Sequence, residues 1–136
     1  MFNTILLPVD VAHLDEGRKS LDVALSITGS EAAITLLYVM EDIPNWTDID
    51  LPSNFKENSM QKAREALESI IDNNDRKISV EVRAGHTYST ILKEAKATNA
   101  DLIILASHKP GLIDYFLGSN TSKVVNHADC SVVVVR

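Results

Sequence analysis

The chain has 136 residues and a formal net charge of −6 at pH 7, with 45% hydrophobic and 24% charged residues. This length fits one domain over residues 1–136, and the composition is that of a globular protein rather than a disordered one. The acidic balance argues against nucleic acid as a partner, and no apolar run approaches the ~20 residues of a membrane-spanning helix.

Strand and helix patterns alternate in the first part of the chain. Residues 4–9 form a short continuous apolar run, which predicts a strand covered on both faces and stopping at Asp10. Apolar residues at three- and four-residue steps then predict a helix from Leu14 that ends at Gly29. Residues 33–40 supply the second predicted strand.

Residues 41–53 differ in composition, with two prolines, a tryptophan and several acidic residues. They predict a long irregular segment, which is either a lid or partner surface or plain surface disorder. A strong helical stripe follows from Phe55 and ends near residues 73–74.

The second part of the chain continues the alternation. Residues 78–83 alternate apolar and polar side chains, which predicts a strand near a sheet edge. A third helix around residues 88–95 precedes a buried strand at 102–106. A last helix, 118–127, leads into the apolar strand 131–135.

This alternation predicts an α/β fold. Strands separated by helices imply right-handed crossovers and an open five-stranded parallel sheet with helices on both faces. Ligands bind such sheets beyond the carboxyl ends of the strands, where the winding direction reverses. Asp10, Val39 with Met40, and Ala106 stand at those ends, so three separated segments are expected to share one crevice.

Gly118, Ser119, Asn120 and Thr121 open the last predicted helix in the manner of a phosphate site. The first N–H groups of a helix lack intrahelical partners and lie at its positive dipole end, where anions bind. Gly118 would supply clearance, and the next three residues would supply hydroxyl and amide donors. The alternative is that Ser119 or Asn120 merely caps the helix.

Three residues at the strand ends have two interpretations each. Asp10 can accept hydrogen bonds from ribose hydroxyls or cap the following helix. Pro8 has no N–H to donate, which suits either a strand end shaped for a flat ring or an edge position. Val39 can offer backbone groups and an apolar surface to an adenine base, or it can simply belong to the core.

The loop after the fourth strand begins Ser107-His-Lys-Pro. Lys109 is placed to meet phosphate charge, whereas His108 has no partner at a triad spacing. Neither GxxxxGK[ST] nor GxGxxG occurs, which argues against a Walker-type NTPase or a dinucleotide site. The four histidines lack the close pairing of metal sites, and the single cysteine, Cys130, is predicted to be a small buried hydrophobe.

Five stretches carry a family resemblance: residues 5–10, 36–39, 84–85, 100–108 and 117–136. On these stretches the chain resembles a small single-domain universal stress protein over essentially its whole length. The resemblance implies an adenine-nucleotide α-hydrolase-like fold with the sheet order 3-2-1-4-5. It also implies a homodimer that pairs its last strands, Ser131 to Val135.

The phosphate loop departs from the pattern of the ATP-binding branch, G-x2-G-x9-G-[S/T]. Ala106 and Lys109 stand at the two early glycine positions, and eight residues separate Lys109 from Gly118. The loop resembles that of a subgroup with Ser-His-basic-Pro and Gly-Ser-Asn that is associated with nucleotide binding. We therefore expect it to admit nucleotide, with the lysine charge replacing lost amide contacts.

With no apolar spanning run and no basic segment followed by an apolar stretch at the amino terminus, the expected compartment is the cytosol. The resemblance implies an ATP-binding stress-response regulator with slow or no hydrolysis, and no catalytic residue is assigned. ATP, with or without Mg²⁺, would be held by Asp10 at the ribose and by Pro8, Val9 and Val39 at the adenine. The phosphates would be surrounded by Ala106, Ser107, Lys109, Gly118, Ser119, Asn120 and Thr121.

Two other functions remain open. One is a stress protein that binds no nucleotide and acts as a dimeric interaction module, with residues 41–53 as the surface for an unknown protein partner. The other is an adenylating or nucleotidyl-transferring enzyme, which would need a substrate pocket and more chain.

Overall fold

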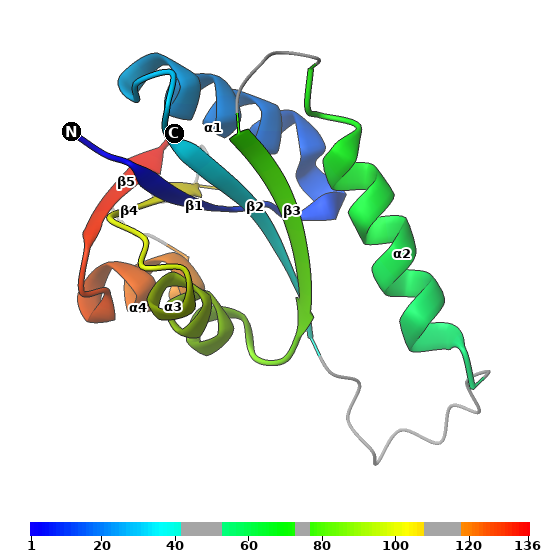
Figure 1. Ribbon diagram of the computed structural model, residues 1–136. Coiled ribbons are helices and arrows are strands. Elements are labelled where there is room, and N and C mark those ends of the chain that lie inside the picture. The colour runs from blue at the N-terminus through cyan, green and yellow to red at the C-terminus, as the bar shows by residue number, and fades with distance from the viewer. Residues whose placement is uncertain (42–52, 73–76, 108–117) are drawn as a thin grey trace.

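The computed structural model is a five-stranded sheet between two layers of helices (Figure 1). It describes residues 1–41, 53–72, 77–107 and 118–136. The strands are β1 (Thr4–Pro8), β2 (Ala33–Met40), β3 (Lys77–Ala84), β4 (Leu102–Ala106) and β5 (Ser131–Val135). The helices are α1 (Leu14–Ile27), α2 (Phe55–Glu68), α3 (Thr87–Ala97) and α4 (Ser119–His127), with a 3-10 turn, η1 (Val11–His13).

The strand order β3-β2-β1-β4-β5, with every pair parallel, confirms the predicted sheet and the edge position of β3. The chain winds from β1 through β2 to β3, then crosses back to β4 and β5 on the other side of β1. β1 pairs with β2 from Thr4 to Pro8 but with β4 only at Ile5 and Leu6. The sheet therefore opens between the carboxyl ends of β1 and β4, at the reversal where α/β sheets bind ligands.

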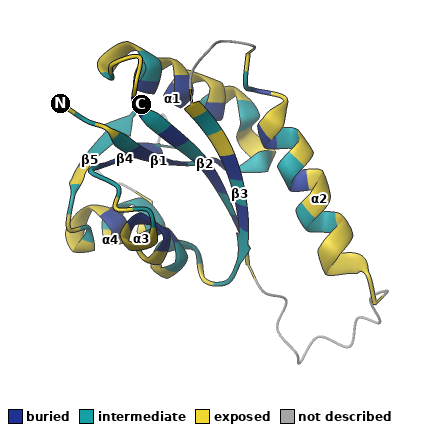
Figure 2. Cartoon of the chain, in the orientation of Figure 1, coloured by how far each residue is buried: buried dark blue, intermediate teal, exposed yellow. Residues whose placement is uncertain are grey.

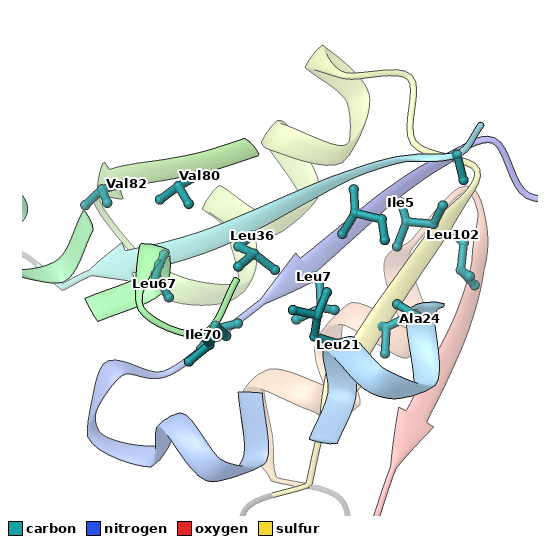
Figure 3. Packing of buried hydrophobic residues seen from close by; sticks show 14 of the residues in the cluster. Ile5, Leu7, Leu21, Ala24, Leu36, Leu67, Ile70, Val80, Val82 and Leu102 are labelled. Atoms are coloured by element: carbon teal, nitrogen blue, oxygen red, sulfur yellow. The ribbon is translucent and has the colours of Figure 1, made fainter. Parts of the chain in front are cut away.

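Alternate side chains of β1 enter two separate cores. Ile5 and Leu7 point to the face covered by α1 and α2, and Leu6 points to the face covered by α3 and α4. In Figure 3 the first core brings together Leu21 of α1 and Leu67 of α2 beneath the sheet. Burial on both faces explains why the central strands are continuous apolar runs in the sequence.

Burial falls toward the edges of the molecule. In Figure 2 the central strands are largely buried, whereas much of α2 is exposed. Cys130 is half-buried against the second core, so the prediction of a buried thiol is only partly met.

The turn η1 was not predicted. The side chain of Asp10 accepts a hydrogen bond from the Ala12 N–H at 2.9 Å and so caps the 3-10 turn before α1 begins. The predicted end of the α2 pattern at residues 73–74 lies outside the described part of the chain. Within it, α2 ends at Glu68.

Candidate functional site

A cleft of about 540 Å³ lies at the carboxyl end of the sheet. It crosses from β2 over β1 to β4 and is flanked by the first turns of α3 and α4. Its lining residues are Pro8, Val9, Asp10, Leu37, Tyr38, Val39, Met40, Glu41, Thr87, Ile91, Leu105, Ala106, Asn120 and Thr121. The three segments expected to converge from the sequence do so here.

The floor of the cleft is the end of β1. The Val9 N–H donates to the Leu37 carbonyl at 2.8 Å, which fixes the chain against β2 one residue beyond the strand. Gly17 of α1 lies directly behind, since a Cβ built there would be 2.6 Å from Val9 Cγ1. The glycine thus lets α1 approach β1 closely where the cleft begins.

Asp10 caps η1 and lines the cleft at once. Its Oδ1 accepts from the Ala12 N–H, and Oδ2 has no hydrogen-bond partner among the described residues. Capping, one of the two roles predicted for this aspartate, is therefore present. The second oxygen has lone pairs left for donors such as sugar hydroxyls.

The wall on the β2 side is built by a sharp connection from β3 to α3. Gly85 has φ +149°, a conformation that L side chains rarely adopt, and its N–H donates to the Met40 carbonyl at 3.0 Å. This turn sets Thr87 over the end of β2, where its Oγ1 donates to Glu41 Oε1 at 2.9 Å. The hydrogen bond ties the two elements together at the edge of the cleft.

The same wall is acidic. Burial raises the pKa of Tyr38, and the carboxylates of Asp10 and Glu41 raise it further. The phenol therefore keeps its proton at neutral pH and remains a hydrogen-bond donor.

The opposite wall is the first turn of α4. Gly118 is the N-cap residue and has no side chain to satisfy the helix end, so the alternative in which Ser119 or Asn120 caps the helix is wrong. The Ser122 N–H donates back to the Gly118 carbonyl at 2.8 Å. Asn120 and Thr121 line the cleft beside the first-turn N–H groups, which lack partners in the helix itself.

Most of the residues predicted for the site are gathered here, and some are not. Pro8, Val9, Asp10, Val39, Ala106, Asn120 and Thr121 line the cleft. Ser107, whose N–H donates to the Val135 carbonyl at 2.9 Å, does not line it, and neither do Gly118 and Ser119. Lys109 lies outside the described residues.

Sequence reasoning missed part of the β2 wall, namely Tyr38, Glu41, Thr87 and Ile91. Glu41 is one residue past the second strand, so the strand-end rule that selected Asp10 would also have found it. Thr87 carried no comparable signal, because its position depends on the turn at Gly85.

The sequence matches the model of the Universal stress protein family over residues 1–136. The chain belongs to the universal stress protein family. Universal stress protein G of Escherichia coli O157:H7 is 28% identical over 145 residues, with 100% of both chains covered.

Several solved structures share the fold of this universal stress protein, and two of them hold a nucleotide. One is a universal stress protein in complex with cAMP, with a TM-score of 0.65, 16% identity, and coverage of 99% of this chain and 97% of that chain. The other is an Arabidopsis thaliana member of the family with AMP bound, with a TM-score of 0.61, 16% identity, and coverage of 98% and 90%. The neighbours have the adenine-nucleotide α-hydrolase-like fold that the resemblance implied.

In the described part of the chain, no helix is long and apolar enough to span a membrane. The same residues contain no group of three or more histidine, cysteine or acidic side chains able to hold a metal ion.

Proposed function

We propose that this universal stress protein binds an adenine nucleotide, ATP, in the cleft at the carboxyl end of the sheet. The observation that carries the proposal is that one cleft joins an apolar floor, a carboxylate oxygen of Asp10 with lone pairs available, and a helix start without a side-chain cap. A volume of about 540 Å³ is within the usual range for small-molecule sites.

The chemistry of the walls orients the nucleotide. Pro8, Val9 and Val39 offer apolar surface for a base, and Asp10, which also lines the cleft, accepts from ribose hydroxyls. The α4 start favours phosphate through its N–H groups and dipole. Of the phosphate set implied by the resemblance, Ala106, Asn120 and Thr121 line the cleft, whereas Ser107, Gly118 and Ser119 do not, and Lys109 lies outside the described residues.

The nucleotide is proposed as a signal rather than a substrate. Asp10 and Glu41 are the only carboxylates among the described lining residues, and each already accepts a hydrogen bond from the protein. No histidine, lysine or cysteine lines this described part of the cleft. With no evident general base to activate water, bound ATP, with or without Mg²⁺, would be hydrolysed slowly or not at all by this cytoplasmic regulator.

The proposed assembly is a homodimer through β5. This edge strand pairs with β4 on one side, and Val132 to Val135 are apolar and half-buried. Its other edge presents unpaired backbone groups that a second copy can satisfy. In analytical ultracentrifugation the wild type should be a dimer and Val134→Lys should be a monomer. Val125→Lys, on the exposed surface of α4, should remain a dimer. A monomeric wild type would contradict the proposed assembly.

Calorimetric titration of nucleotide-free protein with ATP tests binding. Two variants separate the roles of Asp10: Asp10→Asn keeps an oxygen for the cap, and Asp10→Ala removes the oxygen and should also cost about 1 kcal/mol of stability. Both should weaken ATP about tenfold through the lost ribose contact, while free inorganic triphosphate binds as before. Chromatography of the mixture should show ATP intact after many hours.

The alternative of a nucleotide-independent interaction module predicts a different result. Folded wild-type protein that gives no heat at millimolar ATP would reject the proposed function. Equal losses of ATP and triphosphate in Asp10→Asn would indicate a collapsed cleft rather than a lost sugar contact.

A further inference from the structure

The cleft is chemically asymmetric from one end to the other. Its β4 end meets the donors of the α4 first turn, and its β2 end meets the carboxylate of Glu41 and the Thr87 hydroxyl. A nucleotide whose phosphates occupy the α4 end therefore directs its base toward Glu41. This step rests on the proposed function.

Glu41 is held in position. One oxygen, Oε1, accepts from Thr87 Oγ1 at 2.9 Å, and Oε2 has no hydrogen-bond partner among the described residues. Thr87 itself is fixed as the first residue of α3, immediately after the turn at Gly85. Asp10, the other ionisable group near this wall, is also a carboxylate, and the side chain of Tyr38 packs against the first core, on the opposite face of β2 from α3.

A carboxylate can only accept hydrogen bonds. The 6-amino group of adenine donates, whereas the 6-oxo group of hypoxanthine or guanine accepts, so two acceptors would face each other. Two acceptors that face each other repel, and an acceptor that loses water without gaining a donor adds a desolvation cost, so such a group discriminates between the two bases.

We propose that Glu41, positioned by the Thr87 hydroxyl, makes the cleft selective for 6-aminopurine nucleotides over 6-oxopurine nucleotides. Glu41 is the specificity-determining residue, and Thr87 is a positioning residue that acts through it. Because Glu41 is exposed and water can still solvate its carboxylate, the effect is about tenfold rather than the much larger factor of a fully enclosed site.

AMP and IMP provide the direct comparison, since they carry the same sugar and phosphate and differ at the purine 6-position and its adjacent nitrogen. The ratio of their dissociation constants is measured by calorimetry for the wild type and four variants. Glu41→Gln offers either an amide oxygen or an amide N–H to the base, so the preference for AMP should fall about tenfold. Glu31→Gln, at the opposite end of β2, removes the same charge without lining the cleft and should leave the ratio unchanged.

Thr87 is tested with a matched pair. Thr87→Val removes the hydroxyl at nearly constant shape, which frees Glu41 and should lower the AMP preference severalfold. Thr87→Ser keeps the hydroxyl and should restore the wild-type ratio.

Each outcome decides the inference. An unchanged ratio in Glu41→Gln with normal AMP affinity overturns it and leaves the proposed function standing. Equal ratios for Thr87→Val and Thr87→Ser overturn the positioning role. A wild type that binds neither AMP nor IMP, nor ATP, removes the proposed function and the inference with it.

Discussion

Replacing Gly17 with alanine should destabilise the protein although it adds only one methyl group to a helix. A Cβ at this position would be 2.6 Å from Val9 Cγ1 and 3.5 Å from both Ile70 Cδ1 and Val9 Cγ2. Carbon atoms pack at about 3.5–4.0 Å, so the nearest contact is too short by about 1 Å. Val9 is β-branched and buried, so its side chain cannot move aside freely.

Two opposing terms set the magnitude for Gly17→Ala. Overpacking of this kind costs about 1–3 kcal/mol, and the helix propensity of alanine over glycine returns about 1 kcal/mol. The expected net loss is about 1 kcal/mol, which lowers the Tm of a chain this long by roughly 3–4 °C. ATP binding should weaken as well, because Val9 lines the cleft.

Urea denaturation followed by circular dichroism measures the loss. Gly29→Ala is the matched control, since nothing lies within 4 Å of its added Cβ. Adding Val9→Ala to Gly17→Ala removes the clashing methyl, so the double variant should be about 1 kcal/mol more stable than the sum of the single effects predicts. A Gly17→Ala protein as stable as Gly29→Ala, with additive effects in the cycle, would refute the reasoning.

Three further predictions concern single residues. The Ser20 hydroxyl is fully buried with no hydrogen-bond partner in the described structure, so Ser20→Ala should raise the free energy of unfolding by about 1 kcal/mol; a loss in urea denaturation would contradict this. The Cβ added by Gly118→Ala meets no protein atom within 4 Å, so the Tm should be unchanged. The same methyl group would hinder a phosphate that approaches the α4 start, so ATP affinity should fall, and unchanged affinity in calorimetry would contradict phosphate binding beside Gly118. Burial, and then the Asp101 carboxylate, raises the pKa of Cys130, so iodoacetamide should modify the folded protein at pH 8 more slowly than the denatured chain. Equal rates of modification in the folded and denatured states would contradict this prediction. Because the pKa of Cys130 is higher in the folded state, the stability that the protonated thiol contributes is complete below the unfolded pKa and is lost as the pH rises through the folded pKa.

The layered fold could be predicted because its signals are local. Residues 4–9 and 102–106 are apolar without interruption since both faces of β1 and β4 are covered. The alternation of residues 78–83 correctly placed β3 at an edge. The turn η1 could not be predicted because it depends on which N–H group donates to the Asp10 side chain, and in the structure that group is the Ala12 N–H.

The site could be predicted only along the strands. The ends of β1, β2 and β4 follow from parallel pairing, which brings Asp10, Val39 and Ala106 to one edge. The α3 contribution could not be found this way, because Thr87 reaches the cleft through the unusual backbone at Gly85. The close approach of Gly17 to Val9 could not be predicted from the sequence either, because a glycine within a helix indicates only a low helix propensity.

The central position of β1 has a consequence for synthesis. Its amino end is fixed by Asp101, whose carboxylate accepts from the Asn3 and Thr4 N–H groups, and its second neighbour, β4, begins at Leu102. A nascent chain therefore carries the apolar strand β1 with one flank open until residues 102–106 have been synthesised. Over that interval the exposed flank is a surface for chaperone binding and for misassembly with other unfolded chains.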